Sequence, residues 1–396
     1  MLITVSLSVG LMFGQLAIMA VPALSVELAV LWQMDAAEIG WLGGIYFAGY
    51  AVALPFLAGA ANRTDGRIVY SVAALVSAAA SFGVALFADG FWWALVFRFA
   101  AGVGFAGIHI VGMKMLADRL TGTSQVRASA IYTGAFAAGS GCSFLVAGFL
   151  SKLLGWEAAF VAAGVGSLLS LPVLLLIGPP LDGNDIRSRR LFPDIGAALR
   201  DAEITRYVIA YAGNLWEVFA IRVWFVPFLV FNAASNNGAV SGWDPTLVAG
   251  LSVFVAVPLN LAIAELGVRW GRKTVIFAVS LASVLVCGLL GWQTSGPYVL
   301  VLALLLVHGV TSYGDVGAIA GGIVAASTVE TRAAALALFG LLGFTFGFLG
   351  PLAVGLAVDL SGGPEEPGAW LWAFAVMALG SVVSAAAMAW TPKSKV

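Results

Sequence analysis

Ionisable side chains stand inside long apolar stretches of this sequence, and their types are the ones that could do chemistry. The clearest pair is Glu217 and Arg222, which stand within the apolar segment 207–231. An Asp, Lys or Arg at the centre of a membrane helix costs roughly 2.5 to 3.5 kcal/mol on insertion scales, so we expect such charges to serve a site. A structural ion pair, or an Arg222 side chain that reaches a lipid headgroup, is the alternative.

Two further apolar segments carry polar groups at helical spacing. Segment 91–116 contains Arg98 and His109, and segment 297–326 contains His308 and Asp315. The spacing places both members of each pair on one face of a helix. Each face therefore combines a histidine with a second charged group.

The segment around Glu217 has a polar stripe of its own. Tyr211, Asn214 and Glu217 share one side of a helix, whereas Arg222 points away from Glu217 by roughly 140 degrees. This angle argues against a direct pair between Glu217 and Arg222 within the helix. In the first apolar segment, Gln15 is the main polar residue, and we group it with the others as a candidate substrate contact.

Proton coupling requires a group that changes charge while its access to the two sides of a membrane alternates. The candidates are Glu217, Asp315, His109 and His308. We expect Glu217 to face one of the other three rather than Arg222. For each histidine, a hydrogen-bonded structural role is the alternative.

The arginines in the apolar segments suggest anion recognition. An arginine stays protonated in proteins, so a buried one is a fixed positive charge. We expect Arg98, Arg222 and His109 to bind an anionic part of a solute. Neutralisation of the arginines by Glu217 and Asp315 is the alternative.

Metal binding and catalysis have less support. His109 and Met113 share one helical turn, with Met115 and Cys142 as conceivable additions, and such soft ligands suit Cu(I). Only one such pair is present, so we expect neither a metal nor a cofactor. The sequence contains no Walker loop, nucleophile elbow or zinc-binding cluster, and we expect no enzymatic activity.

The composition is that of a membrane protein. The 396 residues are 61% hydrophobic and 10% charged, whereas soluble proteins average about 45 to 50% apolar and about 25% charged residues. The net charge of -1 gives no sign of the basic surface that nucleic-acid binding requires, and we expect no nucleic-acid partner. Cys142 and Cys287 lie in hydrophobic runs and are interpreted as small core residues. The first apolar run has no charged region before it, which predicts a retained span.

At about 20 apolar residues per crossing, the sequence predicts about twelve membrane helices. The runs lie near 3–24, 39–60, 68–88, 91–116, 128–151, 156–178, 205–231, 245–267, 274–293, 297–326, 333–358 and 369–391. The long polar segment between the sixth and seventh runs divides them. We therefore predict a six-helix bundle at 1–178, a cytoplasmic loop at 179–204 and a second six-helix bundle at 205–396.

The basic residues predict the orientation. If the N-terminus is cytoplasmic, nearly all of the 19 Lys and Arg residues lie in inner loops and tails, the exceptions being Arg98, Lys152 and Arg222. Acidic residues such as Asp35 and Glu365 then lie outside. The positive-inside bias thus predicts that both termini are cytoplasmic.

The two halves repeat each other. RASAIYTG at 127–134 resembles TRAAALALFG at 331–340, and ANRTDGR at 61–67 resembles GVRWGRK at 267–273. Both pairs are separated by about half of the chain. Two similar six-helix units are the build of transporters whose binding site lies between the halves near the bilayer midplane.

The segments 61–67 and 267–273, which lie between predicted spans, resemble the G-x-x-x-D-R-x-G-R-R motif of the major facilitator superfamily. The first copy has Asn62 in the acid position, followed by Arg63 and, after a one-residue insertion, Arg67. The second keeps Arg269, Arg272 and Lys273. GWEAAF at 155–160 resembles a further motif of the family. The resemblance implies that these loops form cytoplasmic gate contacts.

The resemblance implies an all-α secondary transporter that works by alternating access. We expect a monomer in a bacterial inner membrane that moves a small organic or inorganic anion or zwitterion, with protons. Proton-driven drug efflux is one alternative. Many proton-driven exporters of the superfamily carry G-x-x-x-G-P-x-x-G-G in the fifth span, but here Ser140 stands in place of the proline after Gly139. Copper import is another, and a non-transporting sensor or scaffold is the alternative of a different class.

Overall fold

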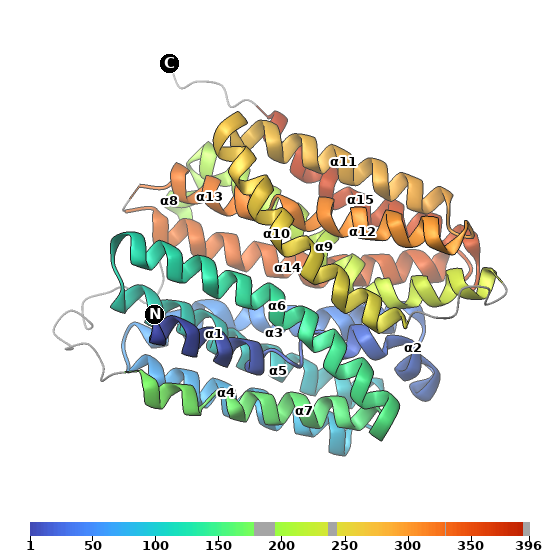
Figure 1. Cartoon of the computed structure of the whole chain (residues 1–396), viewed down its shortest axis with the longest axis horizontal. Helices are drawn as coiled ribbons and strands as arrows, with labels where there is room; N and C mark the ends of the chain where they lie inside the picture. The colour runs from blue at the N-terminus through green and yellow to red at the C-terminus, as the bar shows by residue number, and fades with distance from the viewer. Residues whose placement is uncertain (178–194, 237–243, 329, 391–396) are drawn as a thin grey trace. The chain divides into compact units, whose positions relative to one another are not determined.

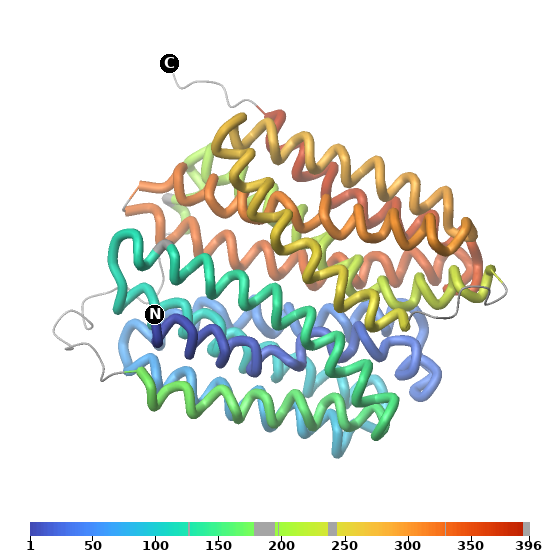
Figure 2. The backbone as a smooth tube through the Cα atoms, viewed as in Figure 1, coloured from blue at the N-terminus to red at the C-terminus, as the bar shows by residue number. Residues whose placement is uncertain are grey.

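The computed structural model describes residues 1–177, 195–236, 244–328 and 330–390, and these residues form helices and no strands. Figure 1 shows the helices, and Figure 2 shows the course of the backbone. The first eight helical elements are α1 (Leu2–Gly14), α2 (Ala20–Trp32), α3 (Ala36–Ala61), α4 (Gly66–Phe87), α5 (Phe91–Arg119), α6 (Gly122–Leu154), α7 (Trp156–Leu169) and the 3-10 helix η1 (Pro172–Leu176). The others are α8 (Ile195–Leu199), α9 (Ala202–Ser235), α10 (Pro245–Trp270), α11 (Arg272–Trp292), α12 (Tyr298–Gly314), α13 (Val316–Ala326), α14 (Arg332–Leu360) and α15 (Pro367–Ala389).

The described helices account for the predicted spans. Eleven stretches are long and apolar enough to cross a membrane, with α7 and η1 forming one of them and α12 and α13 another. The remaining span, predicted as one run at 3–24, is instead two short helices, α1 and α2. The described residues therefore form the predicted all-α bundle, in which the first of the twelve predicted spans is broken.

The described residues divide into two compact units. Unit 1 comprises 1–33, 45–177 and 249–253, and unit 2 comprises 34–44, 195–236, 244–248, 254–328 and 330–390. The start of α3 belongs to unit 2 because both carboxylate oxygens of Asp359 accept hydrogen bonds there, from the backbone N–H groups of Ala36 (3.0 Å) and Ala37 (2.7 Å). The predicted boundaries at 178 and 205 stay a prediction, since residues 178–194 lie outside the described residues.

Part of the predicted polar loop is helical. Helix α8 and the first residues of α9 occupy positions that the sequence assigned to the loop. Asp201 explains where α9 begins, because its side chain accepts hydrogen bonds from the backbone N–H groups of Glu203 and Ile204. Such a cap satisfies donors that have no partner inside the helix.

In unit 1, polar side chains hold the break between α1 and α2. The Ser143 hydroxyl donates to the Leu16 carbonyl (2.6 Å) and accepts from the Met19 N–H (3.0 Å). Gln15 Nε2 donates to the carbonyls of Ala135 and Phe136 on α6. Irregular backbone at membrane depth is tolerated only where protein groups replace the missing hydrogen bonds. The break is therefore a stable part of unit 1.

Helix α9 lies at the centre of unit 2. It is the most buried of the membrane-spanning helices, with 78% of its apolar window buried, and it packs along α14 and α15. Trp224 fixes it there, because the indole N–H donates to the carbonyl of Pro351 at 3.0 Å. The polar residues of α9 are thus enclosed by other helices of the unit.

Candidate functional site

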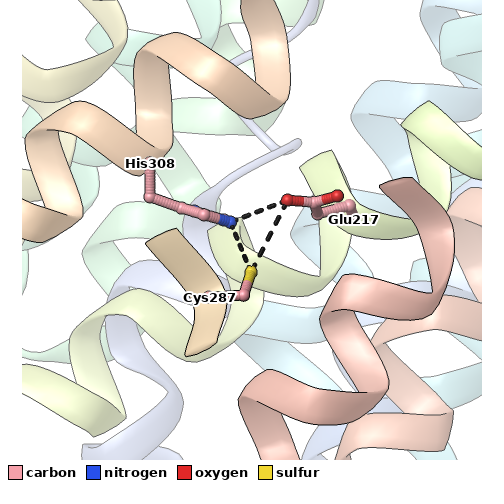
Figure 3. Close-up of side chains that lie close together, drawn as sticks. All are labelled: Glu217, Cys287 and His308. Atoms are coloured by element: carbon pink, nitrogen blue, oxygen red, sulfur yellow. Dashed lines mark hydrogen bonds and ion pairs between the residues drawn. The ribbon is translucent and has the colours of Figure 1, made fainter. Parts of the chain in front are cut away.

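A cluster of polar side chains surrounds Glu217 in the interior of unit 2. Glu217 lies on α9, Ser283 and Cys287 on α11, His308 on α12 and Ser381 on α15. His308 Nε2 lies 2.8 Å from Glu217 Oε1, which also accepts a hydrogen bond from Ser283, while Oε2 accepts one from Ser381. Cys287 Sγ lies 3.1 Å from His308 Nε2 and 3.7 Å from Glu217 Oε1. Figure 3 shows three of these groups converging on one point.

The sequence identified part of this cluster. It named Glu217 and His308 as candidates and left the partner of Glu217 open, and the structure places His308 beside it. Cys287 was interpreted as a core residue, and Ser283 and Ser381 were missed. The four-residue spacing of Ser283 and Cys287 places them on one helical face and is the signal that was available.

Asp315 forms a second polar site with Asn214, at the junction of α12 and α13. Asn214 Nδ2 donates to Asp315 Oδ1 and to the Ser312 carbonyl, both at 2.7 Å. Both side chains are buried. Asn260 Nδ2 donates to the carbonyl of Tyr313 at 2.7 Å, so the helix junction is also held by side chains. Within the described ranges, no ion pair of Asp315 is found.

Arg222 is a buried cation without an acidic partner among the residues that the structure describes. Its guanidinium carbon lies 5.2 Å from the centre of the Tyr313 ring and 5.7 Å from that of Phe219. In the described part of the chain, Nη1 has no hydrogen-bond partner. The intrahelical pair with Glu217, against which the sequence argued, is also not found among these residues.

Arg98, in contrast, is bound to backbone. It is 1% exposed, and its guanidinium donates to the carbonyls of Ala17 (2.5 Å) and Ile18 (3.4 Å) in the break between α1 and α2. The guanidinium carbon also lies 4.6 Å from the centre of the Tyr46 ring. These contacts, like those of Gln15, favour a structural role over the predicted contact with substrate.

Aromatic rings surround the remaining candidates. His109 Nδ1 lies 2.8 Å from the Tyr50 hydroxyl, and the imidazole stacks on Phe136 with ring centres 4.9 Å apart. Tyr211 stacks on Phe339 at 3.5 Å. These contacts do not test the alternative that His109 and Met113 bind copper.

A comparison of the sequence with models of known protein families identifies the family of this chain. The family model of the Major Facilitator Superfamily matches residues 4–257. The chain belongs to the major facilitator superfamily. This membership confirms the resemblance that the loop motifs and the repeat indicated.

Two curated proteins are similar in sequence to this chain. The niacin transporter NiaP of Acinetobacter baylyi is 27% identical over 159 residues, which is 40% of this chain and only 36% of that protein. The putative niacin/nicotinamide transporter NiaP of Bacillus subtilis is 22% identical over 360 residues, 87% of this chain and 86% of that protein.

Solved superfamily structures share the fold. The nucleoside transporter NupG superimposes with a TM-score of 0.75 at 18% identity, covering 98% of this chain and 99% of that one. An inward-facing, unoccupied bacterial homologue of the human lysosomal transporter Spinster gives a TM-score of 0.74 at 16% identity, covering 98% and 95%. At these identities the likeness concerns the fold alone.

The first superfamily loop, 61–67, contains an ion pair. Asn62 occupies the acid position of the motif and Arg63 is exposed, but Asp65 is bonded to Arg67, with Nη2 and Oδ2 2.8 Å apart. Asp65 also caps α4 by accepting a hydrogen bond from the Arg67 N–H. The guanidinium of Arg67 holds the pKa of the Asp65 carboxyl below its usual range. The inserted acid therefore supplies a partner within the loop.

The second superfamily loop, 267–273, is also tied by ion pairs. Arg269 Nε lies 3.0 Å from Glu265, and Lys273 Nζ lies 2.9 Å from Glu203 on α9. Arg272 begins α11. The gating role of these residues stays a prediction.

Proposed function

We propose that this superfamily member is a proton-coupled secondary transporter of a small organic anion or zwitterion, and that Arg222 binds the anionic group of the solute. The observation that carries the proposal is the buried guanidinium of Arg222, whose Nη1 has no partner among the described residues. A buried charge without a partner is strongly unfavourable, so a site of this kind is completed by an anion.

The groups around Arg222 suggest what the anion is attached to. A guanidinium matches the two oxygens of a carboxylate, and the pair is stronger than a neutral hydrogen bond. The rings of Tyr313 and Phe219 lie beside the guanidinium, and Tyr313, which is partly exposed, offers apolar surface for a flat ring. An aromatic carboxylate fits both features.

The sequence relatives support the same class of solute. They are named as a niacin transporter and a putative niacin/nicotinamide transporter. Nicotinic acid is a pyridine with one carboxylate, and it is anionic or zwitterionic depending on pH. Both relatives come from bacteria, which supports a place in the bacterial inner membrane.

We assign proton coupling to Asp315. This buried carboxylate is hydrogen-bonded to the neutral amide of Asn214 and has no cationic partner among the described residues. Binding of a proton therefore removes a buried negative charge that no cation compensates. Asp315 lies at the junction of α12 and α13, where the span is interrupted. Its change of charge therefore acts on the interrupted part of the backbone.

The carboxylate proposal is tested by comparing nicotinic acid with nicotinamide, which has the same ring and no carboxylate. Wild type in proteoliposomes is expected to take up nicotinic acid, whereas Arg222→Gln loses tenfold or more of this uptake. The reason is that a hydrogen bond to a charged group contributes about 1.5 to 3 kcal/mol. Arg222→Lys is expected to recover part of the uptake, because it keeps the charge without the planar fork.

The control for this comparison is Arg200→Gln, which removes an exposed arginine and is expected to transport as wild type does. Uptake of nicotinic acid by Arg222→Gln at the wild-type rate would contradict the role of Arg222. No uptake of nicotinic acid by wild type would contradict the proposed solute.

The proton proposal is tested by imposing a pH gradient, acidic on the side of uptake. The gradient is expected to increase nicotinic acid accumulation by wild type and to have no effect on Asp315→Asn, whose amide cannot gain a proton. Exchange of labelled for unlabelled solute without a gradient is expected to persist in this variant. Asp118→Asn, at an acid paired with Lys114 near the end of α5, is the matched control. A full response to the gradient in Asp315→Asn would refute the assignment.

A further inference from the structure

Half of the histidines and half of the cysteines of this chain meet at one carboxylate. The sequence has 2 His and 2 Cys residues, and His308 and Cys287 lie with Glu217 so that one ligand atom of each is within 4.8 Å of the others. All three side chains are essentially inaccessible to solvent. We propose that Glu217, Cys287 and His308 bind a divalent transition-metal ion of the zinc class.

The positions of the ligand atoms suit a single ion. Glu217 Oε1, Cys287 Sγ and His308 Nε2 come from α9, α11 and α12, and they face one another (Figure 3). Their separations are 2.8, 3.1 and 3.7 Å. Bonds from zinc are about 2.0 to 2.2 Å to oxygen or nitrogen and about 2.3 Å to sulfur. Side-chain rotations that move each atom by less than about 1 Å would place all three on one ion.

The charges of the ligands match a divalent ion. Metal binding requires a thiolate, a carboxylate and a neutral imidazole, so Cys287 and Glu217 together carry two negative charges. An ion with two positive charges makes the site neutral, which an apolar interior favours. Without a metal, the thiolate form of Cys287 would be buried beside a second negative charge.

The ligand types select the ion. One sulfur, one nitrogen and one oxygen suit zinc and its neighbours, whereas calcium and magnesium take oxygen ligands only. Three protein ligands leave the fourth tetrahedral position open for a water molecule or a solute group. The Thr311 hydroxyl donates to Ser283 at 3.2 Å, and Ser283 donates to Glu217. Thr311 is a partly exposed residue of α12, so hydrogen bonds connect the cluster to a residue with some solvent access.

Neighbouring hydroxyls hold one ligand in position. Ser381 on α15 donates to Glu217 Oε2, the oxygen that is not shared with His308. Partners of this kind orient metal-binding carboxylates and strengthen metal sites. The bound ion would link α9, α11 and α12 and thereby stabilise unit 2.

The experiment measures metal in the purified full-length protein after incubation with Zn²⁺ and removal of free ion. Elemental analysis is expected to give about one zinc per chain for wild type, at least a tenfold lower content for Cys287→Ser, and a comparable loss for His308→Gln. The remaining cysteine and histidine provide matched controls. Cys142→Ser and His109→Gln are expected to keep the wild-type content, because both residues lie in unit 1.

Two measurements on wild type test the site without any variant. Co²⁺ is expected to produce a thiolate-to-metal absorption band, and Zn²⁺ is expected to raise the melting temperature, since a ligand of the folded state stabilises it. Absence of zinc from wild type, or zinc retained in Cys287→Ser but lost in Cys142→Ser, would overturn the proposal. None of these measurements depends on transport, so they are independent of the proposed solute and of proton coupling.

Discussion

Arg98 and Arg222 are both buried in membrane spans, and they differ in what their guanidinium groups contact. Arg98 donates to backbone carbonyls of the broken first span through Nη1 and Nη2, and its Nε has no partner among the described residues, whereas in Arg222 it is the terminal Nη1 that has none. The sequence assigned both to anion recognition, because a buried arginine has the same type and the same surroundings in either role. Only the contacts separate a structural arginine from one that is free to bind an anion.

This difference predicts opposite effects on stability and transport. Arg98→Gln is expected to lower the free energy of unfolding by about 1.5 to 3 kcal/mol, because hydrogen bonds from a charged donor to buried carbonyls are lost. Arg222→Gln is expected to leave the melting temperature at or above that of wild type and to reduce transport. Thermal unfolding of wild type and of the two variants in one detergent measures these changes in stability. A larger loss of stability in Arg222→Gln than in Arg98→Gln would contradict the two roles.

At the scale of the elements, three of the described spans are interrupted, at α1 and α2, at α7 and η1, and at α12 and α13. Side chains from other helices hold the first and the last of these interruptions. The break between α1 and α2 is bound by Ser143 on α6, and the junction of α12 and α13 is bound by Asn214 on α9 and Asn260 on α10. Broken helices in transporters occur where backbone groups line a site or are buried in protein. In this chain, side chains of the same unit donate hydrogen bonds to the backbone carbonyls at these two breaks.

Two neighbouring serines on α6 test this account of the first break. Ser143→Ala removes the bonds to the Leu16 carbonyl and from the Met19 N–H, and it is expected to cost about 1 to 3 kcal/mol. Ser140→Ala is the control, because within the described part of the chain Ser140 donates to the Phe136 carbonyl of its own helix, which also accepts from Gln15. We expect this control to change stability by less than about 0.5 kcal/mol. Equal melting temperatures for both variants would show that Ser143 does not hold the break.

At the scale of the whole molecule, the charge distribution predicts how the spans are oriented. The basic loops at 61–67 and 267–273 are expected in the cytoplasm, and the acidic loop that contains Glu365 is expected outside. The positions Arg63, Arg269 and Glu365 are exposed, so each can report on its side of the membrane.

Cysteine labelling measures this orientation. In a background with Cys142→Ser and Cys287→Ser, a membrane-impermeant thiol reagent added to intact cells is expected to label Glu365→Cys. It is expected to label Arg63→Cys and Arg269→Cys only after the cells are made permeable. Labelling of the two basic-loop positions in intact cells would show that the positive-inside prediction is wrong for this chain.

The sequence by itself determined the membrane character, the twelve spans and the family, because each follows from the length, composition and motifs of local stretches. It also named Glu217, His308 and Asp315, since a charge inside an apolar run is visible without a structure. It missed Cys287, Ser283 and Ser381, which look like ordinary small residues of membrane helices.

The tertiary structure decided which of these groups meet. Glu217 and Ser381 lie 164 positions apart and Arg98 and Ala17 lie 81 apart, so helix packing alone brings each pair together. The same packing leaves Arg222 without an acidic partner among the described residues and joins Asp315 to Asn214. A residue's type and helical face can be predicted from local spacing, but its partner depends on which helices pack side by side and at what height.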